Sequence, residues 1–165
     1  VSLHCSALTY MLAATAGPGA VSFLQAAKKK GVSIFYISNR DTTEIQSKVH
    51  NLIKVPCPDA ATAHMLFLSN TSSEETRRQK VMAKYNVIML LGDNLNDFTS
   101  FFEKGTIASR FTETDKAKAF WGKKFIVLPN AIYGEWENAL YNYQRNITPE
   151  KKDSLYWRLL KDIER

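Results

Sequence analysis

The chain has 165 residues, of which 45% are apolar and 12% aromatic, and its formal charge at pH 7 is +6. This length and apolar content suit one folded domain with a sizeable core and exclude a disordered chain. The lysines are spread along the sequence, and their densest run, 28–30, falls where a helix is expected to end, so we expect solvated side chains there. Because the aromatic and basic signatures of RNA-binding modules are missing from the sequence, we predict no nucleic-acid partner.

Cysteine and histidine give no sign of a metal site or a disulfide framework. Cys5 and Cys57 lie far apart without a CxxC pair, and the histidines show no ligand spacing. The first residues are mildly apolar, but they lack a basic flank and a small residue before Cys5. No stretch reaches the roughly 18 apolar residues of a membrane span. We therefore expect neither an export signal nor a transmembrane helix in this sequence.

Hydrophobic periodicity predicts alternating helices and strands. In chain order the expected elements are a helix over about 18–30, a strand over 32–37, a helix over 42–54, a strand over 64–68, a helix over 74–85, a strand over 87–91, helices over 98–105 and 112–121, a strand over 124–129, and helices over 132–144 and 148–164. The run 87–91 is typical of a fully buried strand, and Thr148 is expected to cap the last helix. This alternation predicts an α/β fold, a doubly wound parallel sheet with helices on both faces.

Polar residues directly follow three of the predicted strands, at 38–41, 69–73 and 92–97. Serine, asparagine and aspartate also favour ordinary turns, so any one of these segments alone is more simply a turn. Three such segments together favour a shared site, because ligands of open α/β sheets bind beyond the carboxyl ends of the strands. The last segment carries two carboxylates, Asp93 and Asp97, within "LLGDNLNDF".

Five segments with their spacing resemble one known family. The segments "PGAVSF", "FYISNRD", "SSEETRRQKV", "LLGDNLNDF" and "WGKKFIVLPNAIYGEWENAL" are similar to those of the class C bacterial acid phosphatases, the lipoprotein-type 5'-nucleotidases of the haloacid-dehalogenase superfamily. The resemblance implies a haloacid-dehalogenase-like core over 18–146, a remnant of the cap region over 1–17 and a C-terminal helix over 147–165. It also implies a phosphate monoester or nucleotide substrate, hydrolysed through an aspartyl-phosphate with Mg²⁺. The location it implies is periplasmic or outer-membrane-anchored, through an N-terminal lipid anchor that this sequence does not show.

The resemblance assigns roles to residues that follow the predicted strands. Asp93 would be a Mg²⁺ ligand, and Asp97 would orient a ligand or a water behind it. Ser38 would donate a hydrogen bond to the phosphate. The residues expected to contact or shape the substrate site are Asn39, Arg40 and Tyr133.

One departure from the family is the missing DxDxT motif, which in relatives supplies the nucleophile at the end of the first, central strand. The earliest aspartate of the sequence is Asp41. We therefore expect the chain to begin after that motif, to lack the first central strand and to be inactive alone. The strands over 32–37 and 87–91 would then have unpaired edges, and we expect the isolated chain to fold poorly or to self-associate.

A second departure is Glu74, which stands at a catalytic position where relatives usually carry a lysine. Reversing a charge beside a phosphate changes an interaction worth roughly 4 kcal/mol at about 4 Å in an intermediate dielectric. In one interpretation Glu74 is an ordinary first-turn helix residue that pairs with Arg77 and Arg78. In the other, Arg77, Arg78 or Lys80 supplies the missing positive charge.

Two other functions fit parts of the sequence. A non-catalytic relative that binds phosphate or a partner protein would account for Glu74 and for the missing motif. A flavodoxin-like or receiver-type domain would also place aspartates after its strands, but it offers no place for "LPNAIYGEWE". A DxDxT motif in the coding sequence upstream of Pro18 would support the enzyme.

Overall fold

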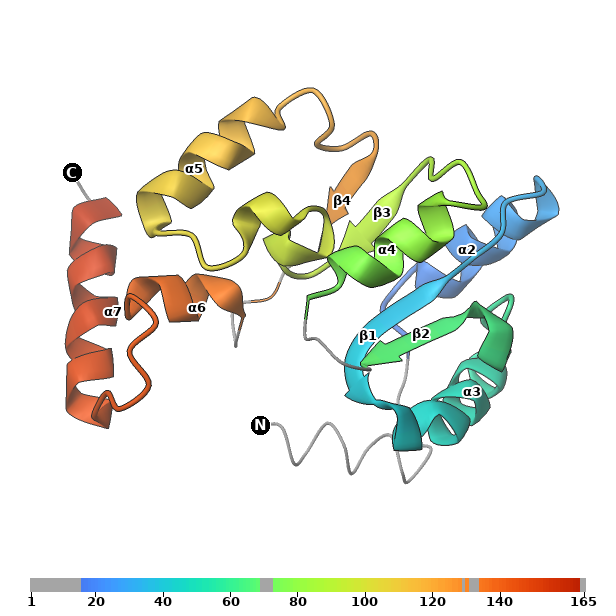
Figure 1. The fold of residues 1–165 in the computed structure, drawn as a ribbon, viewed down its shortest axis with the longest axis horizontal. Helices are drawn as coiled ribbons and strands as arrows, with labels where there is room; N and C mark the ends of the chain where they lie inside the picture. Colours follow the sequence, from blue (N-terminus) through green and yellow to red (C-terminus); the bar gives the residue numbers. More distant parts are fainter. Residues whose placement is uncertain (1–15, 69–72, 129, 131–133, 164–165) are drawn as a thin grey trace. The chain divides into compact units, whose positions relative to one another are not determined.

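The computed structural model of the chain describes residues 16–68, 73–128, 130 and 134–163 (Figure 1). For residues 161–163 it describes the backbone but not the side chains. The chain divides into two compact units, Val1–Lys84 and Tyr85–Arg165, which we call the N-terminal and the C-terminal unit. The predicted core over 18–146 takes in parts of both units, and most of the predicted cap remnant lies outside the described residues.

The N-terminal unit is a short parallel sheet with helices packed around it. Its elements are α2 (Ala20–Lys29), β1 (Tyr36–Asp41), a 3₁₀ turn (Thr42–Glu44), α3 (Ile45–Lys54), a second 3₁₀ turn (Thr62–His64), β2 (Met65–Leu68) and α4 (Glu75–Met82). β1 and β2 are parallel, with Tyr36 opposite Met65. α3 lies along β2 (Figure 1), and Val49 of α3 packs there against Met65 and Phe67. Ile45 and Leu52 of the helix also pack against this cluster, while Ile53, at the same helical spacing, is 58% exposed.

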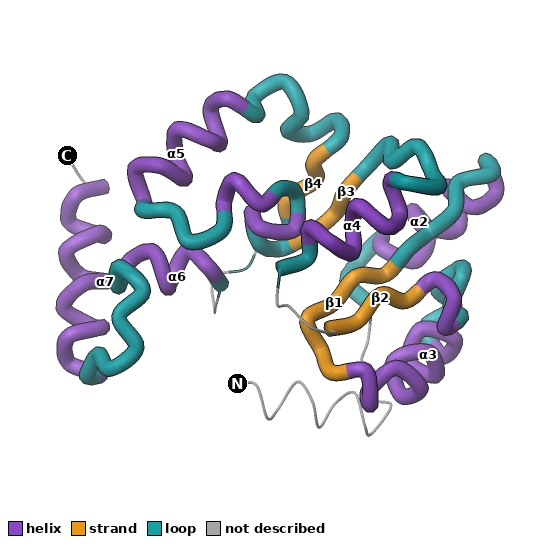
Figure 2. Tube along the Cα trace, viewed as in Figure 1, coloured by secondary structure: helices purple, strands orange, loops and turns teal. Residues whose placement is uncertain are grey.

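The C-terminal unit contains a second pair of parallel strands. Its elements are β3 (Leu90–Gly92), 3₁₀ turns at Leu95–Asp97 and Ser100–Phe102, α5 (Ile107–Lys116), β4 (Phe125–Val127), α6 (Glu135–Leu140) and α7 (Pro149–Ile163). Both strands are short (Figure 2), and Gly92 pairs with Val127 at their carboxyl ends. Phe98 and Phe102 are 3% and 0% exposed, and both rings lie against the indole of Trp121. Phe98, Phe102 and Trp121 therefore pack together as an aromatic cluster in this unit.

Two predicted strands begin later than expected. β1 starts at Tyr36 because the Ile34 N–H donates instead to the Asp59 carboxylate at 2.9 Å, and β1 runs on through the polar residues to Asp41. β3 starts at Leu90, and Ile88 and Leu91 are 57% and 44% exposed, so the prediction of a fully buried strand over 87–91 is wrong. A sheet two strands wide covers too little of each strand to bury it on both faces.

Two predicted helices are also wrong in extent. The stretch expected to be a helix over 98–105 forms a 3₁₀ turn at Ser100–Phe102 instead, because the Thr99 side chain accepts the Phe101 N–H that a continuous helix would use. The helix expected over 112–121 begins earlier, at Ile107, where the Thr106 hydroxyl caps it by accepting the Ser109 N–H at 3.2 Å. The other helices are confirmed within a few residues of their expected ends, the one over 132–144 as the shorter α6.

The cap predicted for the last helix is confirmed, since the Lys151 N–H donates to the Thr148 hydroxyl at 3.4 Å and Pro149 opens the helix. A Thr148→Ala substitution removes this acceptor, and we expect it to lower the free energy of unfolding by about 1 kcal/mol. Urea unfolding followed by circular dichroism measures the change. Thr148→Ser keeps the acceptor and should unfold like the parent chain, and a loss as large as that of the alanine variant would contradict the capping role.

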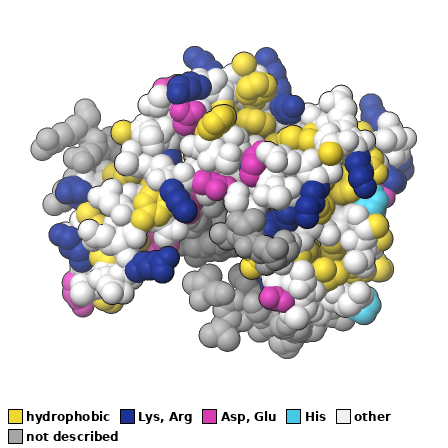
Figure 3. Space-filling model, in the orientation of Figure 1, with side chains coloured by type: hydrophobic (Ala, Val, Ile, Leu, Met, Phe, Trp, Pro, Cys, Tyr) yellow, Lys and Arg dark blue, Asp and Glu magenta, His cyan; other side chains and the backbone are white. Residues whose placement is uncertain are grey.

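Basic side chains, dark blue in Figure 3, are distributed over the surface and not gathered in one patch on the face in view. Lys28 of the densest lysine run is paired with Asp59 at 2.6 Å. Within the described ranges, none of the helices combines the length and the hydropathy that crossing a membrane requires.

Candidate functional site

Asp93 follows β3 directly, at the carboxyl end of the strand. Its side chain is exposed, and its Oδ2 atom accepts a hydrogen bond from the Asn130 amide at 2.8 Å. Asn130 comes shortly after β4, which pairs with β3 in parallel, so the two strand ends bring the side chains together. One carboxylate oxygen of Asp93 is thereby fixed, while the structure gives Oδ1 no hydrogen bond from a described residue.

Asp97 turns back onto the loop that carries Asp93. Its Oδ2 accepts the Asn94 N–H at 2.9 Å, and the Asn94 side chain accepts the Asp97 N–H in return, so a reciprocal capping box closes the loop. A Cβ on Gly92 would lie 2.2 Å from Asp97 Oδ2 and 2.4 Å from Asp97 Cβ. Glycine at position 92 is therefore what lets Asp97 pack beneath the loop.

Asn130 is a candidate site residue that the sequence interpretation did not single out. A signal for it was present, since a polar residue that closely follows β4 lies at the same edge of a parallel sheet as a polar residue that follows β3. Tyr133, which was predicted from the same segment, lies outside the described residues.

The donor set at Asp93 fits one ligand of a divalent cation. Mg²⁺ prefers oxygen ligands and is commonly held by one or two carboxylates together with waters and substrate oxygens. Asp93 offers an exposed carboxylate with one oxygen oriented by Asn130. In the described part of the chain, however, no group of three or more His, Cys, Asp or Glu side chains is placed to hold a metal ion. Asp93 and Asn130 therefore suit one part of a cation site, and further ligands would have to come from outside the described residues, from water or from the substrate.

Ser38, Asn39 and Arg40 lie on the carboxyl-terminal half of β1, in the N-terminal unit. The Ser38 hydroxyl accepts the Arg40 N–H at 3.3 Å, which leaves its own proton for another acceptor. The Arg40 guanidinium donates to Glu44 at 3.0 Å, so its charge is already paired. The strand register shifts between Ile37 and Asp41, which places these side chains on an irregular stretch of β1.

Asn39 and Arg77 connect β1 to α4. The Arg77 guanidinium donates to the Asn39 side-chain oxygen. Arg77 and its neighbour Arg78 are 3% and 2% exposed, and burial lowers the pKa of Arg77 from its usual value. The sequence does not reveal this contact, because 38 residues separate the partners and no local pattern links them.

Glu74 precedes α4 and lies between the two buried arginines. Its carboxylate oxygens are 3.9 Å from the Arg77 guanidinium and 4.0 Å from that of Arg78, which also pairs with Glu75 at 2.7 Å. This confirms the pairing expected of a first-turn helix residue. It also puts a positive charge, that of Arg77, in contact with Asn39 of β1. Ser72 and the rest of the segment 69–72 lie outside the described residues.

The site candidates thus fall into two groups. Ser38, Asn39, Arg40 and Glu74 belong to the N-terminal unit, and Asp93 and Asp97 to the C-terminal unit. Within the first group Asn39 and Glu74 share the partner Arg77, and in the second Asp97 supports the loop of Asp93. Their assigned roles in catalysis and binding remain predictions.

Comparisons with known proteins bear on the family. Residues 9–136 match the family model described as HAD superfamily, subfamily IIIB (Acid phosphatase). The solved structure of the class C acid phosphatase from Bacillus anthracis is 35% identical, with a TM-score of 0.87, and the match covers 94% of this chain and 66% of that one. The crystal structure of the same enzyme with tungstate bound gives 35% identity and a TM-score of 0.87, over 93% and 65% of the two chains.

The chain thus spans slightly less than two thirds of the length of these relatives. The α/β fold predicted from the sequence is confirmed, and so is the resemblance drawn from its motifs. The chain belongs to subfamily IIIB, the acid phosphatases, of the HAD superfamily.

Proposed function

We propose that the protein hydrolyses phosphate monoesters, using Asp93 to hold a divalent cation. The observation that carries the proposal is the exposed Asp93 carboxylate after β3, with one oxygen fixed by Asn130. A divalent cation supplies charge neutralisation to a phosphate group in transfer. Mg²⁺ is the cation we propose, because a single oriented carboxylate is a usual protein contribution to its oxygen shell.

The chain's own residues would prepare the site in separate ways. Asn130 orients Asp93, and Asp97 holds the loop through the Asn94 N–H, so the carboxylate is positioned before a cation arrives. In the N-terminal unit the Ser38 hydroxyl keeps a proton that it can donate to a phosphate oxygen. Arg77 would keep Asn39 in place beside it.

The finer parts of the proposal follow from the family. We propose nucleotides or similar aromatic phosphates as substrates, an aspartyl-phosphate intermediate, and a periplasmic or outer-membrane location through a lipid anchor. Tungstate, which is bound in the Bacillus anthracis enzyme, is a tetrahedral oxyanion like phosphate, and this supports an oxyanion site. The 165 residues contain no DxDxT motif and no aspartate before Asp41, so we expect this chain alone to turn over no substrate.

An Asp93→Asn substitution in the complete gene product tests the proposal. It keeps the shape and hydrogen-bonding size of the side chain but removes its charge, and we expect kcat/KM for p-nitrophenyl phosphate to fall about 100-fold or more. The electron paramagnetic resonance signal of bound Mn²⁺ should weaken in parallel, which reports the cation without reference to turnover.

Asp115→Asn is the matched control, because Asp115 is an exposed carboxylate on α5. It should change neither the rate nor the Mn²⁺ signal. Full activity of the Asp93→Asn variant would show that Asp93 is not the cation ligand. The phosphatase activity itself would still stand in that case.

A second candidate is a relative that binds phosphate or a partner protein without catalysis. The observation that favours it is Glu74, whose negative charge is held in place by Arg77 and Arg78 where relatives carry a lysine. Isothermal titration with tungstate, together with a turnover assay of the complete gene product, separates the candidates. Tungstate binding without any turnover would support the binding protein, and turnover that requires Mg²⁺ would exclude it.

A further inference from the structure

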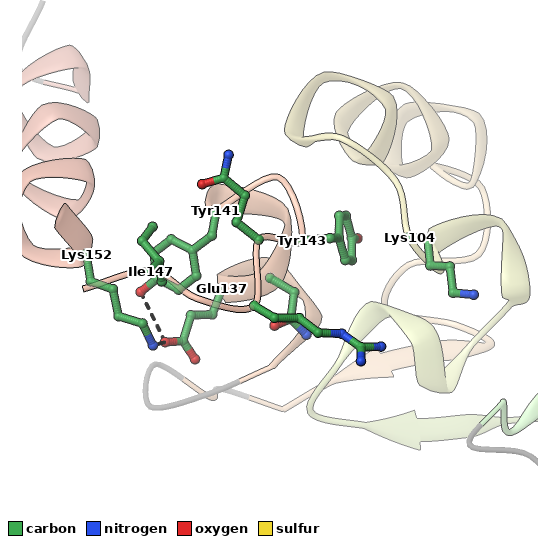
Figure 4. A pocket seen from close by; sticks show the side chains of 9 residues that line it. Lys104, Glu137, Tyr141, Tyr143, Ile147 and Lys152 are labelled. Carbon is green, nitrogen blue, oxygen red and sulfur yellow. Dashed lines mark hydrogen bonds and ion pairs between the residues drawn. The ribbon is translucent and has the colours of Figure 1, made fainter. Parts of the chain in front are cut away.

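A hollow of about 650 Å³ lies within the C-terminal unit (Figure 4), in the size range of pockets for small-molecule ligands. Its walls come from Lys104, from the end of α6, from the α6–α7 connection and from Lys152 of α7. Lys104 lies on one side, and Lys152 with Glu137 on the other (Figure 4). Asp93 and Asp97 are not among the lining residues, so the hollow is distinct from the candidate cation site.

The lining of the hollow carries an excess of positive charge. Its charged side chains are Lys104, Arg145, Lys152 and Glu137. The one carboxylate is already engaged, since Glu137 is 3.7 Å from the Lys152 ammonium and accepts the Tyr141 hydroxyl at 3.1 Å. Lys104 and Arg145 are exposed, and neither has an ion-pair partner among the described residues. Two cations thus remain available to a negatively charged ligand.

One wall of the hollow is rigid. Tyr141 is 5% exposed, its hydroxyl is held by Glu137, and the Lys152 ammonium lies 4.9 Å from the centre of its ring. Tyr143 donates its hydroxyl to the Gly105 carbonyl at 3.0 Å, and burial raises the pKa of this phenol to about 12, so it remains a donor at neutral pH. A ligand would therefore meet a wall whose side chains are already in place.

The backbone around the hollow is strained. Lys104, Asn142 and Tyr143 have φ angles of 54°, 49° and 60°, in the left-handed region that a side chain disfavours. Asn142 ends α6 in the way asparagine often does, but lysine and tyrosine have no such preference. Strain of this kind is retained where the surrounding structure fixes it, and it gathers at ligand sites. Here two of the three strained residues line the hollow.

We propose that this hollow binds a small, multiply charged anion of the diphosphate class through Lys104 and Arg145. The two available cations provide the attraction, and the fixed tyrosine wall limits the ordering that binding requires. The volume exceeds that of a bare diphosphate, so a nucleoside diphosphate also fits the hollow by size. This inference is independent of the proposed phosphatase activity, because it uses none of the residues assigned to that activity.

Isothermal titration of the complete gene product with inorganic pyrophosphate and with ADP, without divalent cations, tests the inference. We expect one site per chain, with a Kd that rises as salt is added because charge dominates the contact. A Lys104→Gln/Arg145→Gln variant keeps two long polar side chains but removes both charges. It should raise the Kd at least about tenfold, since one hydrogen bond to a charged group is worth about that factor. Tighter binding of ADP than of pyrophosphate would identify the nucleoside diphosphate as the ligand class.

A Lys151→Gln/Arg158→Gln variant is the matched control. Both residues are exposed on α7, outside the hollow, and the variant loses the same charge. It should leave the Kd within about twofold, and Asp93→Asn should not change it either. Circular dichroism of each variant confirms that it is folded. The inference is overturned if neither probe binds at millimolar concentration, or if the control pair weakens binding as much as the hollow pair does.

Discussion

A Glu74→Lys variant is expected to be less stable than the parent chain by about 3–5 kcal/mol, although it installs the lysine that the family resemblance leads us to expect there. In the structure the Glu74 carboxylate is 3.9 Å from Arg77 and 4.0 Å from Arg78, and the two arginines are 3% and 2% exposed. A lysine at this position replaces the attraction of Glu74 to Arg77 and Arg78 with repulsion from both. The repulsion is strong because the two arginines are buried. The loss can be measured by urea unfolding of the complete gene product.

The same substitution is not expected to raise phosphatase activity. Repulsion by a new ammonium group would displace Arg77, and with it the hydrogen bond from Arg77 to Asn39 on β1. A gain in kcat/KM for the complete gene product would mean that the introduced ammonium can neutralise phosphate without disturbing the arginines, and the inference about Arg77 would then be wrong.

Two variants isolate the electrostatic cause of this loss. Glu74→Gln removes the attraction without adding a charge, and we expect it to fall between the parent and the lysine variant. Glu113→Lys reverses an equivalent charge on α5, where the partner Lys116 is 67% exposed, and should cost less than about 1 kcal/mol. Equal losses for Glu74→Lys and Glu113→Lys would show that the burial of the arginines has no effect.

A Gly92→Ala variant is expected to lose about 3 kcal/mol or more of stability and to release Asp93 from its position. The new methyl group would lie 2.4 Å from Asp97 Cβ, an atom that no rotamer can move, so the backbone itself must shift. Gly92 is also the last residue of β3, and its carbonyl accepts the Leu128 N–H at 2.8 Å. Urea unfolding gives the stability change, and the Mn²⁺ signal of the complete gene product reports the displacement of Asp93.

Gly122→Ala is the control for the glycine substitution. Gly122 has a φ of 72° with nothing within 4 Å of a Cβ, so alanine there meets the cost of a left-handed backbone, about 1–2 kcal/mol, without a clash. A Gly92→Ala variant no less stable than Gly122→Ala would show that Asp97 can leave its place easily. The capping box would then be a weak support for the loop.

Local patterns predicted most of the helices well. The stripe of Ile45, Val49 and Leu52 has helical spacing, and its burial against β2 follows from the same residues. The failures occur where a side chain takes a backbone partner. Thr99 breaks the stretch that looks helical over 98–105, and Asp59 delays the start of β1. Periodicity cannot register such bonds, because each depends on one polar atom.

The candidate site was predictable to a similar degree. The position of Asp93 after β3 follows from the apolar run and the glycine before it. Its bond to Asn130 follows from the parallel pairing of β3 and β4, but only after β4 has been placed beside β3. The contact of Arg77 with Asn39 could not be predicted, since it depends on how α4 packs against β1. The predicted absence of a central strand, and the poor folding or self-association that would follow, stay predictions.

The capping box between Asn94 and Asp97 also bears on the order of events in folding. Both of its hydrogen bonds join residues three positions apart, so the loop closes without help from distant parts of the chain. Contacts of such short range form quickly, well before strands far apart in the sequence can pair. The loop therefore loses its conformational entropy during folding. A cation that binds Asp93 does not have to order the loop, and its affinity is not reduced by that cost.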